Sequence, residues 1–392
     1  MTLRQQTKRT MEWLIIASIF CAVMLWLPKA HALFWWRRTS LFVAGLLSLV
    51  YLLAYSRQRF KDILSNKTIL AFVILSTGLL LLRSPWPAGL IGQPLVHPGL
   101  LSLLSAIAIG LFLQSFPEER VWTVYYYAVL WWALVCLLSW TAAAPGGRLG
   151  FVDSQVIYAS YLFMTGIIIG HWLWVKRHIG RYAAVLGISF LTVCLVLSQT
   201  RSALGITLLY FAWYYRRLLS PKLGALVLTG VVALALLLGR GSFWRLHDGA
   251  YFGESVTYRQ HLVQASLPTK TTDWIFGGGV GSIEQNITNH ARNYSDLAPD
   301  ILRAVRFESS HNYLVDVLVE RGIVITVIFA RVVIRALRKQ LKDSYIQGLL
   351  LCTVGYLLVN NINLQMELAL WVMIVWICYP LTLKRRTAYA KG

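Results

Sequence analysis

Long apolar runs separated by short polar breaks make up almost the whole chain. A helix that crosses a bilayer needs roughly 20 mostly apolar residues, with a range of about 17–25. Twelve runs approach this length, and they predict an all-α, polytopic membrane protein. The predicted spans are 12–28, 40–55, 68–83, 99–115, 121–142, 155–175, 182–199, 202–215, 222–239, 313–334, 345–360 and 364–383.

One connection is much longer than the others. It covers residues 240–311, and connections of this length without obvious structure are usually functional. We therefore expect three parts: 1–239 with nine spans, the 240–311 loop domain, and 312–392 with three spans and a tail. The first span lacks a small-residue cleavage site after it, so we expect it to be retained rather than removed as a signal peptide.

The composition excludes several classes of protein. The chain is 57% hydrophobic and only 14% charged, whereas ordinary soluble domains carry about 25% charged residues. A soluble enzyme, a disordered chain and a secreted disulfide scaffold are all excluded. The net charge of +21 is typical of nucleic-acid binders, but here the basic residues punctuate apolar runs, so we expect no nucleic-acid partner.

Lys and Arg are unevenly divided between the two sides that the spans define. With the N-terminus in the cytoplasm, 22 of them lie in cytoplasmic loops or tails and six lie in short loops on the opposite side. Short cytoplasmic loops of membrane proteins carry an excess of Lys and Arg. We expect both termini in the cytoplasm and the long loop outside. The six exceptions are Lys29, Arg37, Arg38, Arg83, Arg148 and Arg201.

Cysteines and acids give no sign of a metal centre. All five cysteines fall inside predicted spans, and no pair forms a CxxC motif, so core packing is their expected role. The acids of the long loop are scattered singly, without carboxylates at metal-binding spacing. We expect neither a metal nor another cofactor.

Two of the outer arginines are candidates for chemistry. Arg201 follows Ser198-Gln199-Thr200, a break so short that the seventh and eighth spans must form a helical hairpin, and Arg148 lies in a glycine-rich loop. Each is either an interfacial anchor, with its stem against apolar surface, or an anion site, because the guanidinium fork fits phosphate oxygens. Arg259, on an amphipathic stretch around 256–267, is by itself a solvated charge.

His311 is the strongest candidate for a general base. It ends the long loop and is followed by Asn312 and the tenth span. A histidine at a helix start is often only a capping or hydrogen-bonding group. Its unperturbed pKa, about 6.5, also suits a base at neutral pH, and a helix N-terminus with nearby arginines disfavours the protonated form.

The tenth span carries charges that are costly at membrane depth. Asp316 and Glu320 are four residues apart and share one helix face, and Arg321 follows them. They are either functional or partners in an intrabundle pair with an arginine. A transporter would explain such charges without chemistry, but the chain shows no internal repeat, which counts against one.

The order of these parts resembles that of the bacterial O-antigen ligases, within a group that includes O-antigen polymerases and O-linking oligosaccharyltransferases. Beyond the twelve spans and the large outer loop, four local motifs carry the resemblance. They are Thr200-Arg201-Ser202; Gly147-Arg148-Leu149; Tyr258-Arg259-Gln260 with Trp274-Ile275-Phe276-Gly277-Gly278-Gly279; and His311-Asn312 followed after nine residues by Gly322. One departure is Ile325, where the family usually has Gly, Thr or Tyr.

The resemblance implies a GT-C-like membrane glycosyltransferase of the bacterial inner membrane with a periplasmic active site. It implies transfer of preassembled polysaccharide from undecaprenyl diphosphate to a sugar hydroxyl of lipid A-core, with membrane lipids around the protein. His311 would be the base. Arg201, Arg148, Arg259 and one loop arginine, Arg303 rather than Arg292 or Arg306, would hold the diphosphate. The supporting residues would be Asn312, Asp316, Glu320, Gly322, Gly277 and Gly279.

Three other functions stay open at this point. A polymerase would use the same donor but extend another lipid-linked glycan. An O-linking oligosaccharyltransferase would use Ser or Thr of a protein as the acceptor. A transporter or lipid flippase would move its substrate without changing it.

Overall fold

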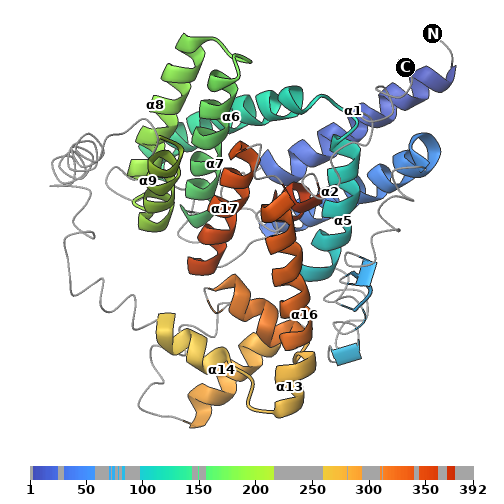
Figure 1. Ribbon diagram of the computed structural model, residues 1–392, viewed down its shortest axis with the longest axis vertical. Helices are drawn as coiled ribbons and strands as arrows, with labels where there is room; N and C mark the ends of the chain where they lie inside the picture. Colours follow the sequence, from blue (N-terminus) through green and yellow to red (C-terminus); the bar gives the residue numbers. More distant parts are fainter. Residues whose placement is uncertain are drawn as a thin grey trace, which may run out of the picture. The chain divides into compact units, whose positions relative to one another are not determined.

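The computed structural model describes the greater part of the chain (Figure 1). The described residues are 3–24, 31–57, 70–71, 73–75, 78, 82–83, 98–143, 149, 156–215, 259–279, 281–293, 310, 312–339, 344–360 and 369–375.

Within these residues the regular structure is entirely α-helical, as predicted. The helices are α1 (Leu3–Met24), α2 (His31–Tyr55), α5 (Pro98–Leu113), α6 (Glu118–Ala143), α7 (Val156–Val175), α8 (Arg181–Leu197), α9 (Arg201–Tyr215), α13 (Thr271–Phe276), α14 (Ser282–Asn293), α16 (Tyr313–Lys339) and α17 (Ser344–Val359). Nine of the twelve predicted spans coincide with a helix of this series. The predicted span 222–239 lies outside the described residues, and 68–83 and 364–383 are described only in part.

The chain forms two compact units. Unit 1 comprises residues 1–118, 265–350 and 361–392, and unit 2 comprises 119–264 and 351–360. The long loop predicted at 240–311 therefore contributes its last part, from residue 265, to unit 1.

In unit 1, α1 and α5 both pack on α2. Tyr51 of α2 lies at the centre of one contact: its ring meets Phe112 edge-on with 5.1 Å between centroids, and its hydroxyl donates to Glu12 Oε1 at 2.8 Å. Later in the chain, α13 and α14 pack on α16 (Figure 1). Two helices of the predicted long loop thus pack against α16 of this unit.

In unit 2, α7 is buried on all sides, from Val156 to Leu173 except Ile157. Such a helix cannot show a polar face, and its sequence is apolar all round, as is typical of a helix at the centre of a bundle. Gly166 and Gly170 allow the close approach, because a Cβ at either position would overlap side chains of neighbouring helices. α8 and α9 pack against α7.

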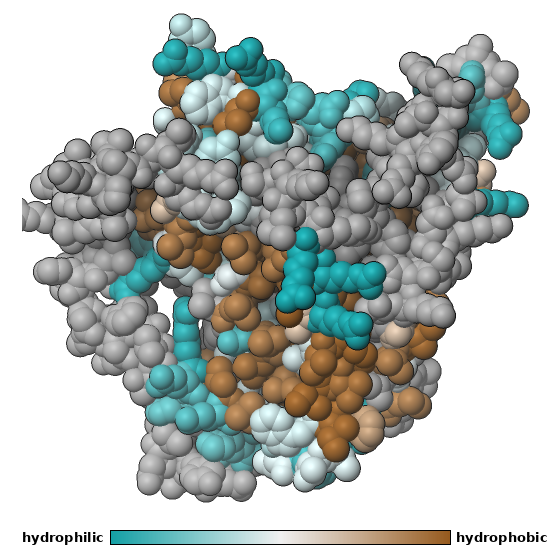
Figure 2. Space-filling model, viewed as in Figure 1, coloured by the Kyte–Doolittle hydropathy of each residue, from teal (hydrophilic) through white to brown (hydrophobic). Residues whose placement is uncertain are grey.

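Among the described residues, two helices are long and apolar enough to cross a membrane by length and composition. They are Glu118–Leu138, within α6, and Val156–Val175. Hydrophobic side chains gather in the middle and lower part of the surface in view (Figure 2). Tyr182 and Leu186 of α8 expose 84% and 71% of their area. The twelve-span arrangement remains a prediction.

The cysteine prediction is confirmed where it is described. Cys136, Cys194 and Cys352 are buried free thiols.

Candidate functional site

The helix that follows the predicted base is broken at the glycine of the histidine motif. Gly322, within α16, has φ 79° and ψ 171°, a backbone conformation that is essentially restricted to glycine. The break separates a first segment, 313–321, from the rest of the helix. A kink of this kind breaks helical hydrogen bonds, so the backbone groups next to it need other hydrogen-bond partners.

The glycine-rich turn of the long loop provides such partners. The N–H of Gly278 donates to the carbonyl oxygen of Val319 at 2.8 Å, and the N–H of Gly279 donates to that of Glu320 at 3.1 Å. The hydroxyl of Ser282, at the start of α14, donates to the carbonyl of Gly279 at 2.8 Å. The aromatic-glycine motif and the histidine motif therefore form one backbone crossing, although more than 30 residues separate them in the sequence.

Two glycines make this crossing possible. Gly277 also has positive φ (81°), and a Cβ there would overlap the carbonyl group of Glu320. A Cβ at Gly322 would overlap the carbonyl of Ile275 and the N–H of Gly277. Close backbone contact thus requires glycine at 277 and 322, and Gly279 has a positive φ of 84°; their supporting role in the reaction stays a prediction.

The first turn of α16 is fixed by polar side chains. Asn312 caps the helix: its Oδ1 accepts from the N–H groups of Leu314 (3.0 Å) and Val315 (3.3 Å). The Asp316 carboxylate accepts from the N–H of Ser310 at 2.8 Å. Ser310 and Asn312 are also joined through the Ser310 hydroxyl, which donates to the Asn312 carbonyl at 3.1 Å. Both chain neighbours of His311 are thereby held; His311 itself lies outside the described residues.

Three ionisable side chains lie buried between the cap and the kink. Asp316, Glu320 and Arg321 expose 6%, 9% and 2% of their area. Burial of charge is costly unless each group is paired or hydrogen-bonded. Asp316 has a defined role in holding the backbone before His311.

Arg83, which in the sequence stands out only as an exception to the distribution of Lys and Arg, also lies in this region. Arg83 donates through Nε to the carbonyl of Gly277 at 2.9 Å and through Nη2 to the Asp273 carboxylate, with which it forms an ion pair. Its fork therefore joins α13 to the glycine-rich turn. Its departure from the positive-inside pattern could have indicated Arg83 as a residue of interest. Nothing in the sequence indicated Asp273 as its partner.

In unit 2, Arg201 is the first residue of α9, directly after the three-residue turn that follows α8. The predicted tight turn is confirmed: Gln199 adopts φ 52°, and the N–H of Ser198 and Gln199 close on α8 carbonyls. Ser198 and Thr200 are buried, and so is the Nη2 atom of Arg201. The guanidinium is thus partly withdrawn from the surface rather than extended into solvent.

The second predicted arginine motif reaches the same turn through the backbone. The N–H of Leu149 donates to the carbonyl of Leu197 at 2.9 Å, and the Leu149 side chain is fully buried. Arg148, the residue before it, lies outside the described residues. The structure therefore brings Leu149 to the end of α8, directly before the turn that leads to Arg201.

A polar contact from the end of α17 completes the surroundings of Arg201. The side-chain amide of Asn360 donates to the hydroxyl of Ser202 and to the carbonyl of Tyr356, each at 3.0 Å, and Asn360 is 1% exposed. One turn earlier, in α17, the Tyr356 hydroxyl lies 2.8 Å from the Ser160 hydroxyl. No local sequence pattern indicates Asn360, because its partner is 158 positions away.

Of the remaining predicted arginines, the structure describes Arg259. Arg259 begins a helical segment, 259–266, within the amphipathic stretch predicted around 256–267, and it is half-buried. Asn286 ties the end of this segment to α14 by donating to the Ser266 carbonyl at 2.9 Å. Arg303 lies outside the described residues, as does Arg306. In the described part of the chain, no three His, Cys, Asp or Glu side chains gather as a metal site would require.

Comparison with known families agrees with this geometry. Residues 184–330 match the family model described as O-antigen ligase. The matched segment includes Arg201, the glycine-rich turn, His311 and Gly322, whereas Arg148 precedes it. No curated protein matches the chain.

The matched segment therefore carries an O-antigen ligase-type domain, and the resemblance seen in the four motifs is confirmed at the level of this family. The match supports, for this segment, a glycosyltransferase-like domain of the O-antigen ligase and polymerase group.

Proposed function

We propose that the protein is an O-antigen ligase. It transfers preassembled polysaccharide from undecaprenyl diphosphate to a sugar hydroxyl of lipid A-core, on the periplasmic side of the bacterial inner membrane, and completes lipopolysaccharide. The observation that carries the proposal is the family match over 184–330, a segment that contains both Arg201 and the HN-x9-G motif.

The donor side of the reaction is assigned to the arginines. The leaving group is a lipid diphosphate, and guanidinium groups bind its oxygens with bidentate, charge-assisted hydrogen bonds. Arg201 and Arg148 are the principal candidates, because the structure brings Leu149, next to Arg148, to the turn that precedes Arg201. Arg259 and Arg303 complete the proposed set.

The acceptor side is assigned to His311. A sugar hydroxyl must lose its proton as it attacks the anomeric carbon, and a neutral imidazole at a helix start accepts that proton. The C–O bond to the diphosphate breaks as the new glycosidic bond forms, with inversion at the anomeric carbon. Ser310, Asn312 and Asp316 hold the backbone on both sides of the histidine.

The energy for the transfer is already present in the glycosyl diphosphate bond, so this reaction requires no nucleotide. Twelve spans with both termini in the cytoplasm place Arg148, Arg201 and the long loop on the periplasmic side, where the donor is presented. The excess of Lys and Arg on the opposite side supports this orientation.

The cellular products separate this proposal from its rivals. Inactivation of the gene in its own host is expected to leave lipopolysaccharide that ends at the core while full-length polymer accumulates on its lipid carrier. Accumulated carrier bearing single repeat units would instead identify a polymerase, and loss of glycan from protein Ser or Thr would identify an O-linking oligosaccharyltransferase. Donor retained on the cytoplasmic side would identify a flippase.

A further inference from the structure

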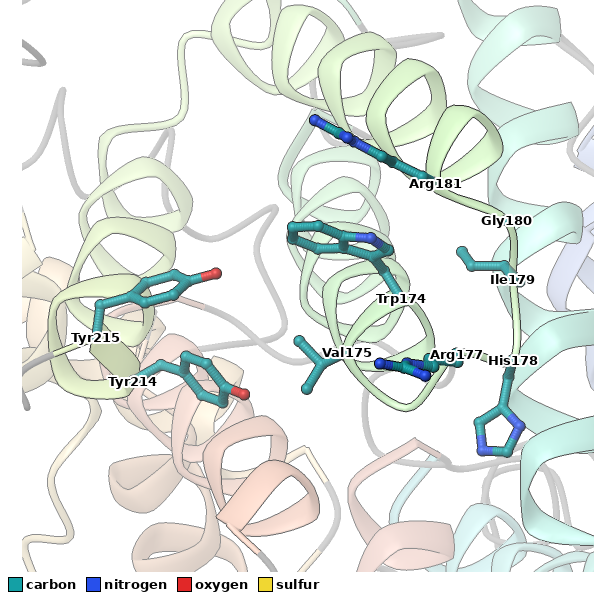
Figure 3. A pocket seen from close by; sticks show the side chains of 9 residues that line it. All are labelled: Trp174, Val175, Arg177, His178, Ile179, Gly180, Arg181, Tyr214 and Tyr215. Atoms are coloured by element: carbon teal, nitrogen blue, oxygen red, sulfur yellow. The ribbon is translucent and has the colours of Figure 1, made fainter. Parts of the chain in front are cut away.

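Unit 2 contains a pocket whose lining includes none of the residues assigned to the transfer reaction. Its volume is about 680 Å³, within the range of about 300–1,000 Å³ that holds small ligands. It lies between the end of α7, the turn into α8 and the end of α9 (Figure 3). The lining residues are Trp174, Val175, Arg177, His178, Ile179, Gly180, Arg181, Tyr214 and Tyr215.

The polar groups of the pocket suit an anion. Arg177 and Arg181 extend from the turn toward the side on which Tyr214 and Tyr215 direct their hydroxyls (Figure 3). Among the described residues, neither arginine forms an ion pair with an acid. α8 begins here after Gly180, which provides no side-chain cap, so the helix N-terminus adds its positive end.

His171 of α7 holds the tyrosines that line one side of the pocket. The ring of His171 in α7 is buried, and its Nε2 lies 2.7 Å from the Tyr215 hydroxyl while Nδ1 lies 3.3 Å from that of Tyr210. His171 also meets Phe211 and Tyr214 edge-on. This aromatic cluster gives the pocket a wall of defined position rather than a set of mobile surface side chains.

The surroundings of the pocket favour a lipid over a soluble anion. One turn after Arg181, Val185 is 49% exposed, and Leu186 and Tyr182 beside it expose 71% and 84% of their area. An apolar helix face that starts at a cationic pocket suits an anionic phospholipid. The phosphate would occupy the pocket, and the acyl chains would lie along the helix face. Trp and Tyr at the ends of apolar helices are typical of the interface where headgroups lie.

We propose that this pocket binds the phosphate headgroup of an anionic phospholipid, with Arg177 and Arg181 as the phosphate ligands and the exposed face of α8 along the acyl chains. The proposal rests on the membrane location stated above, but not on the transfer chemistry. In the proposed orientation the pocket faces the cytoplasmic leaflet, whose surface anionic lipids make negative.

Lipid binding to the purified full-length protein in detergent tests the proposal. Phosphatidylglycerol and phosphatidylcholine with the same acyl chains are titrated, and bound lipid is measured by native mass spectrometry. We expect phosphatidylglycerol to bind at least about tenfold more tightly. The Arg177→Asn/Arg181→Gln variant should lose about tenfold of that affinity, because charge-assisted bonds to phosphate are removed. Asn is chosen since it tolerates the positive φ of Arg177 (61°).

Lys176→Gln is the matched control, because it removes the same charge from the same turn without lining the pocket. It should change the affinity by less than about twofold. If the double variant cannot be purified, each single substitution should show an intermediate loss. Equal binding of the two lipids, an unchanged affinity in the arginine variants, or an equal loss in Lys176→Gln would overturn the proposal. Inorganic phosphate that fills the site while phosphatidylglycerol does not would identify a soluble anion instead. Transfer activity is not a readout of any of these experiments.

Discussion

The start of α16 in unit 1 and the start of α9 in unit 2 both carry a predicted reactive residue, but they are held by different means. At α16 polar side chains hold the first turn, and the N–H groups of Gly278 and Gly279 donate to the carbonyls of Val319 and Glu320, just before the Gly322 kink. At α9 the preceding turn closes on α8 carbonyls, and the side chain of Asn360 donates to Ser202. A base must be placed within hydrogen-bond reach of one hydroxyl, whereas an anion site depends on charge and fork geometry. The first region should therefore be sensitive to added volume and the second to changed charge geometry.

The largest effect is expected from one added methyl group at the backbone crossing. In Gly277→Ala, the Cβ overlaps the Glu320 carbonyl and the positive φ becomes strained. We expect a loss of stability of about 2–6 kcal/mol, measured by thermal or denaturant unfolding in detergent. Gly281→Ala is the control: φ is also positive (80°), but nothing lies within 4 Å of the added Cβ, so it should cost only about 1–2 kcal/mol. Equal losses in the two variants would show that the crossing does not matter.

Arg201→Lys tests the other region, because it keeps the charge and removes the planar fork. We expect a transfer rate about 10–100-fold lower with unchanged thermal stability, since charge-assisted bonds to phosphate are lost. Arg120→Lys, at an exposed position of the same unit that has no assigned role, should keep the parent rate. Full activity of Arg201→Lys would remove the bidentate role from this arginine.

A smaller effect is expected at Asp316, which holds the N–H of Ser310. Asp316→Ala leaves that buried donor without its acceptor, at a cost of about 1–3 kcal/mol, and should lower the transfer rate about tenfold. Asp316→Asn retains an acceptor oxygen and should recover most of the rate. The assay is transfer per folded protein, and an alanine variant as fast as the parent would contradict the positioning role.

The smallest effect is expected from the Arg83–Asp273 pair. The two side chains are 34% and 23% exposed, and pairs of this exposure contribute about 0–1 kcal/mol. A double-mutant cycle with Arg83→Gln and Asp273→Asn should give a measurable coupling energy that stays below about 1 kcal/mol. A coupling energy of zero would mean that Arg83 acts only through the Gly277 carbonyl.

Periodicity and turn chemistry predicted the structural features that depend on residues close together in the sequence. The nine spans that coincide with helices, the tight turn before Arg201 and the helical stretch at 259–266 are of this kind. The crossing of Gly277–Gly279 with Gly322, and the Arg83–Asp273 pair 190 positions apart, depend on tertiary packing, which local pattern does not encode. Gly277, Gly279 and Gly322 were found only through family motifs, and the reason for their presence is seen only in the folded chain.

The most direct test of the central claim is reconstituted transfer with purified lipid-linked polysaccharide as donor and lipid A-core as acceptor. The parent protein is compared with His311→Ala, and a match of their thermal unfolding midpoints shows that both are folded. The account predicts polysaccharide joined to lipid A-core by the parent and a rate about 100- to 10,000-fold lower for the variant, as is usual on removal of a general base. Transfer by His311→Ala at the parent rate would contradict it.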